Sequence, residues 1–384
     1  MKLAIVGGAL QGMEAVYLSK KAGFRTFVID RRENAPALSL ADDHAVLDPV
    51  ISGKEAMRIF EGCDAVLPAC ENLELLCKLE DILSSSSVPL LFDIDSYKVS
   101  SSKSASNILM GSAGIPIPKG RGSGYPAVVK PSSQSGSAGI RVAYNENDIS
   151  EGVQKILNAG DEPVVQEFVS GKNVSLEIIG NGKEYRPFVT TEILLSKDYD
   201  CKRVICSPGI LTAEKEEDLK EIAVSIAKEI GLTSLMDIEA VDTKDGLRIL
   251  EIDARIPSQT PAAVLAATGM NILKEMVFRK FGETVKIDHG ASSYEHFLIK
   301  DGKMMTCGEK EFSGVRGPRI VSGLFGSDEM ITDYDPEKGT WTCAMINRAD
   351  SEEKLERKRS LCIGKIMNEC GIDEFSDESP EMIR

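Results

Sequence analysis

The chain has 384 residues, enough for two or three domains with a substantial core. Its formal net charge of −15 argues against nucleic acid or an anionic membrane as the main partner. Nine scattered cysteines without a C-x-x-C spacing, the lack of a membrane-length apolar run and an N-terminus unlike a signal peptide favour a soluble cytoplasmic protein.

The first 30 residues have the outline of a nucleotide-binding unit. Residues 2–6 predict a strand, a glycine-rich turn covers 7–12, and 13–22 predict a helix. A second strand ends at Asp30, where a ribose-binding acid would lie. However, Ala9 replaces the glycine that lets a backbone approach a pyrophosphate. The turn is equally consistent with a plain strand-to-helix connection, or with a helix N-terminus that binds a substrate carboxylate.

Two polar residues follow a third predicted strand, residues 65–69. Glu71 and Asn72 come just before the predicted helix Leu73–Leu83, and parallel sheets bind ligands beyond the carboxyl ends of their strands. Both residues are therefore candidates for holding a polar group such as an amine, although Asn72 could equally serve as the helix cap. A further strand is expected at 90–93.

A lysine and a flexible loop are adjacent in the middle of the chain. The predicted strand Ala127–Pro131 contains Lys130 and leads into a run of small polar residues, 132–140. Such a loop can fold over phosphates and donate backbone amides, or it can be an exposed linker. The neighbouring elements are a helix expected at 101–112 and strands expected at 164–169 and 173–180.

Acidic residues alternate with apolar ones in two segments joined by a turn. Asp237 and Glu239 lie in the first segment, Glu251 and Asp253 in the second, and the Asp-Gly pair between them is typical of a hairpin. Because strand side chains alternate between faces, the four carboxylates are expected on one face. Close carboxylates repel unless a cation lies between them, and their oxygens suit Mg²⁺. The alternative is a solvated outer face. Arg255 would suit an anion beside the metal.

These elements occur in an order that resembles the ATP-grasp carboxylate–amine ligases, from residue 96 to about 267. The resemblance implies an α/β protein in which an ATP-grasp fold is preceded by a Rossmann-like N-terminal domain. It implies a Rossmann-like domain over 1–95, a central lid over 96–170, and a C-terminal domain over 171–384 that carries the metal site. ATP and Mg²⁺ are the implied cofactors.

The resemblance also implies roles for single residues. Arg255 would stabilise the transferring phosphoryl group and the tetrahedral oxyanion, and Lys103, preferred to Lys98 by its spacing, would neutralise phosphates with Lys130. Many relatives have Asn where this chain has Asp253. The expected ATP-binding residues are Lys103, Lys130, Ser135, Gly136, Gln166, Glu167, Phe168 and Val169. The expected substrate-binding residues are Leu10, Gln11, Gly12, Glu71, Asn72, Glu177, Asp237, Ser258 and Thr260, and the expected metal ligands are Glu239, Glu251 and Asp253.

Over its whole length the chain resembles, more narrowly, the ATP-grasp ligases of pyrrolysine biosynthesis. The resemblance is clearest at 7–23, around Lys103 and at 250–261. It implies that an acylphosphate of 3-methyl-D-ornithine, or of D-ornithine, reacts with the ε-amine of L-lysine.

Two alternatives remain. One is another ATP-grasp ligase, such as a purine-pathway enzyme, which would need a basic pocket where the chain offers little beyond Arg31 and Arg32. The other is a non-catalytic nucleotide-binding or dehydrogenase-like module, against which Ala9 and the acidic set argue.

The pattern is weaker beyond residue 267. Helices are expected at 271–281 and at Glu352–Cys370, and strands at 293–300 and 340–347. The acidic end, 373–384, is expected to be partly disordered.

Overall fold

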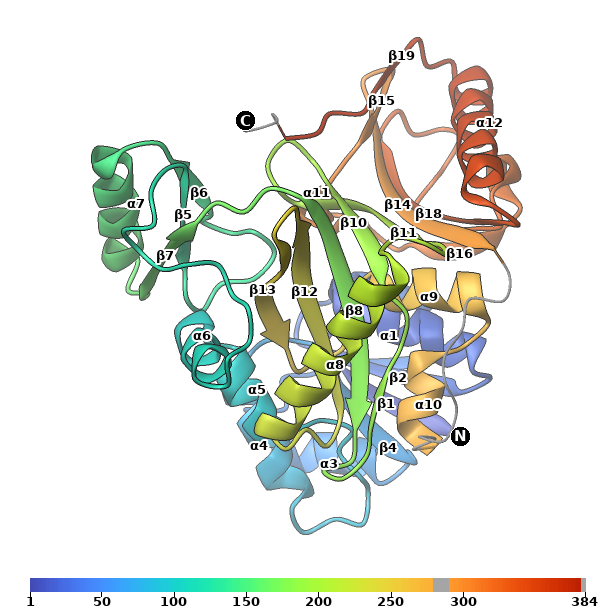
Figure 1. Ribbon diagram of the computed structural model, residues 1–384. Coiled ribbons are helices and arrows are strands. Elements are labelled where there is room, and N and C mark those ends of the chain that lie inside the picture. Colours follow the sequence, from blue (N-terminus) through green and yellow to red (C-terminus); the bar gives the residue numbers. More distant parts are fainter. Residues whose placement is uncertain (279–289, 381–384) are drawn as a thin grey trace.

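The computed structural model describes residues 1–278 and 290–380. Figure 1 shows three parts: a blue N-terminal layer, a green arm that stands apart, and a large central sheet with the C-terminal elements at one end. In the part of the chain that the structure describes, no helix is long and apolar enough to cross a membrane.

The N-terminal layer is a four-stranded parallel sheet in the order β3-β2-β1-β4. The turn after β1 is very tight, because a Cβ on Gly7 would lie 2.4 Å from the Ala69 oxygen and one on Gly12 would lie 2.2 Å from the Gly7 oxygen. The strands are β1 (Lys2–Val6), β2 (Arg25–Asp30), β3 (Asp43–Val46) and β4 (Ala65–Pro68). The helices are α1 (Leu10–Lys21), α2 (Pro36–Leu40), α3 (Gly53–Phe60) and α4 (Leu73–Leu83).

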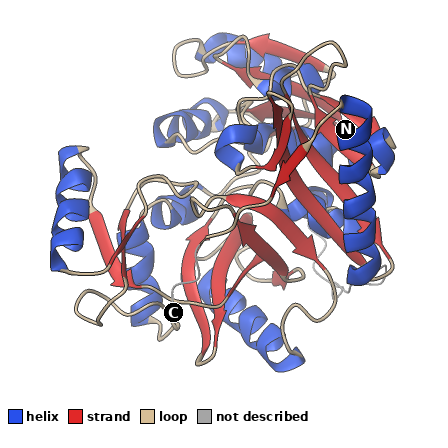
Figure 2. Ribbon diagram, turned by 90° about the horizontal axis from the view of Figure 1, so that it is seen from above, coloured by secondary structure: helices blue, strands red, loops and turns tan. Residues whose placement is uncertain are grey.

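The arm is a small three-stranded antiparallel sheet in the order β6-β5-β7, covered by one helix. Figure 2 shows it beside the large sheet, and residues of both line one cavity, so the arm is called the lid below, after the expected domain. Two short helices, α5 (Ile94–Ser100) and α6 (Lys103–Ser112), lead into it. Its elements are β5 (Ala127–Pro131), β6 (Arg141–Ala143), α7 (Glu146–Asn158) and β7 (Pro163–Glu167).

The large sheet carries the acidic hairpin at one edge, in the order β13-β12-β8-β10-β11-β14-β18-β17-β16. Its first elements are β8 (Lys172–Gly180), β9 (Tyr185–Pro187), β10 (Thr191–Leu195), β11 (Cys201–Cys206), α8 (Ala213–Glu229), β12 (Leu235–Thr243), β13 (Gly246–Asp253), α9 (Thr260–Thr268) and α10 (Ile272–Phe278). The remaining elements are β14 (Ala291–Lys300), β15 (Lys303–Thr306), α11 (Glu309–Phe312), β16 (Arg319–Ser322), η1 (Leu324–Gly326), β17 (Glu329–Thr332), β18 (Trp341–Ala349), α12 (Glu352–Cys370) and β19 (Glu374–Ser376).

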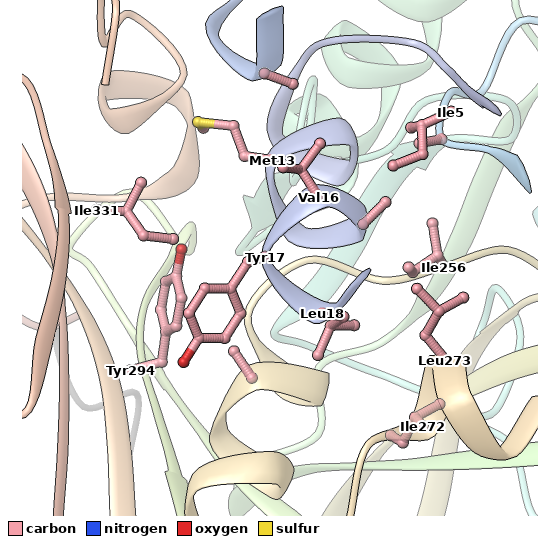
Figure 3. Close-up of a cluster of buried hydrophobic side chains, with 14 of the residues drawn as sticks. Ile5, Met13, Val16, Tyr17, Leu18, Ile256, Ile272, Leu273, Tyr294 and Ile331 are labelled. Carbon is pink, nitrogen blue, oxygen red and sulfur yellow. The ribbon is translucent and has the colours of Figure 1, made fainter. Parts of the chain in front are cut away.

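One hydrophobic core joins the N-terminal layer to the C-terminal half. Helix α1 is buried from Gly12 to Ser19 without interruption, as expected of a helix that is covered on every side. Figure 3 shows Tyr17 from this helix beside Tyr294 of β14, with Ile331 and Leu273 in the same cluster.

The structure corrects two expectations. Residues 90–93 form no strand, because Leu90 makes only an isolated parallel bridge to Val66. The expected helix at 101–112 begins at Lys103, after α5 has ended at Ser100. Within the acidic end, Glu374–Ser376 form β19. The last three residues of the expected helix 271–281, and residues 381–384, lie outside the described residues.

Candidate active site

The acidic hairpin forms as the sequence predicted. Strands β12 and β13 pair antiparallel, with Asp237 opposite Asp253 and Glu239 opposite Glu251. On the other side of β12, strand β8 places Glu177 opposite Asp237. The antiparallel register therefore brings five carboxyl groups together across three neighbouring strands.

Two lysines face this row of acids. The Lys103 Nζ lies 3.0 Å from Glu251 Oε2. It also donates at 2.7 Å to the carbonyl of Gln134 in the loop 132–140, called the lid loop below. Burial lowers the pKa of Lys103, but attraction to Glu251 outweighs it and the pKa is raised. The Lys130 Nζ donates to the Leu250 carbonyl at 3.3 Å, and burial lowers the pKa of this lysine. Both ammonium groups thus lie between the lid and the hairpin.

Arg255 lies at the other end of the row. Its Nη2 is 2.7 Å from Asp253 Oδ2 and 2.8 Å from Glu71 Oε1. Burial raises the pKa of Asp253 to about 7, although Arg255 opposes this, and burial with help from Glu177 raises the pKa of Asp237 to about 8. Burial and the neighbouring Glu251 raise the pKa of Glu239. The acids therefore outnumber the cations that would stabilise their charge.

The donor set at the predicted metal site fits Mg²⁺ in its chemistry, since three carboxylates on paired strands offer oxygen ligands and two of them have raised pKa values. As the side chains stand, no group of three acidic, histidine or cysteine residues among those described is arranged to hold an ion. Glu251 is turned toward Lys103 and Asp253 toward Arg255. Ion binding would require these carboxylates to turn away from their present partners.

A cavity of about 400 Å³ lies between the lid and the large sheet. All eight predicted ATP-binding residues line it, as do the three predicted metal ligands and Arg255. Two backbone donors of the predicted ATP-binding segment 166–169 are already occupied. The N–H groups of Glu167 and Phe168 donate to the Lys119 and Pro126 carbonyls at 2.8 and 3.0 Å. These two donors are unavailable to a ligand unless those bonds break.

The predicted substrate residues separate into two groups. Asp237, Ser258 and Thr260 line the cavity. The other six, which are Leu10, Gln11, Gly12, Glu71, Asn72 and Glu177, are not among the described residues that line it. Glu177 is fully buried behind Asp237, and burial raises its pKa to about 7.

Glu71 nevertheless connects the N-terminal layer to the site. Its Oε1 accepts from Gln11 Nε2 at 2.6 Å and pairs with Arg255, while its Oε2 accepts from Ser135 of the lid loop. The neighbouring Asn72 accepts from the Leu75 N–H at 2.8 Å and caps α4, which was the alternative interpretation of this residue.

Asp30, the acid that a dinucleotide-binding module would use for ribose, is occupied within its own turn. It accepts from the Gly8 N–H at 2.7 Å and pairs with Arg32 at 3.0 Å. These contacts weaken the dehydrogenase-like alternative, and they also engage one of the two arginines that a purine-pathway substrate would need.

Among the cavity residues that the sequence analysis did not single out, three carry ionisable side chains close to the acidic row: Asp200, Cys201 and Glu309. Glu309 begins the short helix α11 and accepts from Ser258 Oγ at 2.5 Å and from Gln259 Nε2 at 2.6 Å. No local signal could have indicated it, because its partners lie about 50 residues earlier in the chain.

The C-terminal segment crosses the rim of the same cavity, and Pro380 is part of the lining. The buried Lys202 holds this segment by donating to Asp377 Oδ1 at 2.6 Å, the Glu378 carbonyl at 2.7 Å and Ser379 Oγ at 2.9 Å. Asp377 also pairs with Arg359 at 2.7 Å.

Comparison with known proteins gives two family matches, an ATP-grasp domain over residues 101–259 and a PylC-like N-terminal domain over residues 3–91. The 3-methyl-D-ornithine–L-lysine ligase of Methanosarcina acetivorans is 36% identical over 317 residues, which cover 81% of this chain and 84% of the relative. The ligase of the same name from Methanosarcina barkeri is 34% identical over the same shares.

Solved structures agree in fold. The biotin carboxylase domain of a Hydrogenobacter thermophilus 2-oxoglutarate carboxylase, solved with MgADP, has a TM-score of 0.71 at 18% identity over 94% of this chain and 89% of that one. An N5-carboxyaminoimidazole ribonucleotide synthetase in complex with ADP has a TM-score of 0.70 at 19% identity over 96% of this chain and 97% of that one. The Rossmann-like layer followed by an ATP-grasp fold is thus confirmed, and this fold implies the use of ATP and Mg²⁺.

Proposed function

Because the chain belongs to the PylC-like family of ATP-grasp ligases, we propose that it joins 3-methyl-D-ornithine to the ε-amine of L-lysine, with release of ADP and phosphate. The reaction is a step of pyrrolysine biosynthesis. The domain boundaries at residues 95 and 170 and the roles of the single residues are part of this proposal.

The observation that carries the proposal is the charge of the cavity wall. Seven acids line it, against three cations, Lys103, Lys130 and Arg255. The acids are Glu167, Asp200, Asp237, Glu239, Glu251, Asp253 and Glu309. With three carboxylates assigned to a metal and Glu167 to the nucleotide, Asp200, Asp237 and Glu309 remain without an assigned cation, which suits an amino acid with two ammonium groups better than a substrate with a phosphate group.

A carboxylate and an amine do not condense unaided, so the carboxyl group must first be activated. A carboxylate oxygen of the ornithine attacks the γ-phosphorus of ATP, and the bond to the β-phosphate oxygen breaks to give an acylphosphate and ADP. The amine of lysine then attacks the carbonyl carbon, and the tetrahedral adduct expels phosphate. A proton must leave the lysine ammonium, whose reference pKa is about 10.4, before this attack.

The residues of this chain would mainly position the reactants and neutralise charge. Lys103 and Lys130, between lid and hairpin, would neutralise the ATP phosphates, and the lid loop around Ser135 and Gly136 would cover them. Arg255 would stabilise negative charge on the transferring group and on the tetrahedral oxygen. Mg²⁺, held by the predicted metal ligands, would supply further neutralisation of the phosphates.

For the amine, Glu71 is the proposed partner, because it links Gln11 of the N-terminal crevice to Arg255 at the cavity. The lysine would enter along Leu10, Gln11 and Gly12, with Asn72 at the same edge of the sheet. Asp237, Ser258, Thr260 and the more deeply buried Glu177 would surround the ornithine.

The test is phosphate release from ATP and Mg²⁺ in the presence of D-ornithine and L-lysine, singly and together. Release that requires both amino acids, with a product whose mass equals the sum of the two less one water, is the expected result. The proposal would be contradicted if no phosphate were released with either amino acid alone or with both together. It would also be contradicted if a phosphorylated ribonucleotide supported release in place of the amino acids.

A further inference from the structure

We propose that Glu309 binds one ammonium group of the diamino-acid substrate and so helps to select a substrate with two amines. This inference rests on the proposed function and adds a residue from the C-terminal half to the substrate site.

The first argument is the position of the carboxylate. Glu309 is partly exposed to the cavity, on the same wall as Ser258 and Thr260. Both of its described hydrogen bonds, from Ser258 Oγ and Gln259 Nε2, end on Oε1. The side chain is thus fixed toward the part of the cavity in which the ornithine is proposed to bind.

The second argument is the missing counter-charge. Among the described residues, no lysine or arginine lies within ion-pair distance of Glu309. Lys103 pairs with Glu251, and Arg255, although near enough for Glu309 to raise its pKa, pairs with Asp253 and Glu71. Other acids lie near enough for Glu309 to raise the pKa values of Asp200 and Glu14, after the larger effect of burial. A carboxylate among carboxylates gains most from a cation that the ligand itself brings.

The third argument is a second polar group on the same wall. Thr260 is 4% exposed and lines the cavity; its hydroxyl makes no direct hydrogen bond among the described residues, although it lies near enough to Glu177 to lower the pKa of that carboxyl. A ligand ammonium beside Glu309 would give this buried hydroxyl a hydrogen-bond donor on the cavity side.

The support beneath Glu309 is rigid, which favours binding. The Lys310 N–H donates to Asp200 Oδ2 at 3.0 Å, and the fully buried Phe312 ring stacks on His296 at 4.2 Å. The carboxylate is therefore held in place before the ligand arrives, so little ordering is needed on binding.

The competing explanation is that Glu309 only holds the loop at 258–260. Gln259 has a left-handed φ of 71° directly before α9, and its bond to Glu309 helps to fix that conformation. The Glu309→Gln variant separates the two roles, because the amide oxygen can still accept from both donors while the charge is lost. Glu311→Gln, an exposed acid in the same helix that does not line the cavity, is the matched control.

The experiment measures KM for D-ornithine, ATP and lysine in wild type, Glu309→Gln, Glu311→Gln and Glu309→Asp. We expect Glu309→Gln to raise KM for D-ornithine by about 10- to 100-fold, the range for a lost hydrogen bond to a charged group, with the other two constants within about 2-fold. Glu311→Gln should match wild type. Glu309→Asp, which keeps the charge, should raise KM for D-ornithine less than Glu309→Gln does. If the Glu309→Gln protein does not fold, Glu309→Asp takes its place in the measurements.

Two analogues test recognition of the ammonium group directly. D-norvaline lacks the δ-amine and 5-aminopentanoate lacks the α-amine, and each is measured as a competitive inhibitor against D-ornithine. If Glu309 binds one ammonium, the Glu309→Gln penalty disappears for the analogue that lacks that amine. Equal penalties for D-ornithine and both analogues, or no penalty at all, would overturn the inference in favour of a loop-holding role.

Calorimetry of D-ornithine binding in the presence of ADP distinguishes the two proposals. If wild type binds D-ornithine and the Glu309→Gln variant binds it more weakly, the Glu309 site is supported even if lysine is not the second substrate. Wild-type turnover with an unaffected Glu309→Gln variant overturns only the Glu309 site. Absence of binding to wild type overturns both.

Discussion

Neighbouring carboxylates of the site differ in their ionisation at neutral pH, although burial acts to raise the pKa of each. Burial acts on Glu251 and Asp253 alike, but two lysines hold the pKa of Glu251 below its usual value while that of Asp253 rises to about 7. At neutral pH Glu251 is therefore the fully ionised member of the pair. This makes it the carboxylate whose charge is most reliably available to a metal ion.

We predict that Glu251→Gln reduces turnover by at least about 10²-fold, the scale of losing one electrostatic contact in a transition state, while the fold is retained. Steady-state phosphate release and a thermal melt measure the two effects. Asp245→Asn, in the exposed turn of the same hairpin, is the control and should behave as wild type. Turnover by Glu251→Gln at the wild-type rate would remove this residue from the metal site.

Glu14 of α1 is a buried acid with no place in the proposed chemistry. It is 2% exposed, accepts from the Ala262 N–H at 2.8 Å, and has a pKa raised to about 8, first by burial and also by Glu309. Its folded pKa is above its unfolded value of 4.5, so the folded state binds the extra proton. Its contribution to stability is fully present below pH 4.5 and is lost as the pH rises through about 8.

We therefore predict that Glu14→Gln, which keeps the acceptor for Ala262, stabilises the protein more at pH 9 than at pH 5, by on the order of 2–4 kcal/mol. Urea unfolding of both proteins at the two pH values gives the difference. A stability gain that does not change with pH would mean that Glu14 is already ionised in the folded protein.

At the scale of elements, local patterns were sufficient to predict a strand or helix where apolar and polar residues alternate with a regular spacing. The alternation of acids in β12 and β13 and the Asp-Gly turn predicted the hairpin, and the strand pattern of β5 predicted the position of Lys130. The other ATP-binding residues were expected from the family resemblance, and all of them line the cavity. Helix α12 was also predicted with its observed bounds, since its apolar spacing is regular.

Contacts between distant segments could not be predicted in this way. Glu309 reaches Ser258 only because β14 and the elements after it fold back on β11, and nothing near Glu309 in the sequence records that. Residues 90–93 have strand-like composition but pair too little to form a strand. The described part of the C-terminal segment is held by Lys202 of β11 and Arg359 of α12, which both bind Asp377, and the composition of 373–384 could not indicate those partners.

We predict that Asp377→Asn loosens the C-terminal segment, because it weakens the contacts of the buried Lys202 and of Arg359. Hydrogen exchange of peptides covering 374–380 should become faster. Glu378→Gln is the control, since its pair with Lys197 has both side chains about 60% exposed and such pairs contribute little. Equal exchange in the two variants would show that Asp377 does not anchor the segment.

At the scale of the whole molecule, the buried apolar residues form several cores in the body of the protein and a separate small core in the lid. The large cluster around α1 joins the N-terminal layer to the C-terminal half, whereas the lid has a separate core of five buried residues. The five are Ala127, Val129, Ala143, Ile149 and Ile156. Local stability follows the buried apolar contacts, so the lid should open independently of the body.

We predict that amides of β5–β7 and α7 exchange at least about 10-fold faster than those of β1 and β2, and that an ATP analogue slows the lid specifically. Exchange followed by mass spectrometry, with and without the analogue, tests this. Lid exchange as slow as that of β1 in the free protein would show that lid and body open as one unit.

The path of the C-terminal segment has a practical consequence for recombinant work. Any fusion partner attached beyond Pro380 would follow a residue that lines the cavity. Met1 is 43% exposed and lies on the side of the molecule away from the lid, so affinity handles and fluorescent reporters belong at that end.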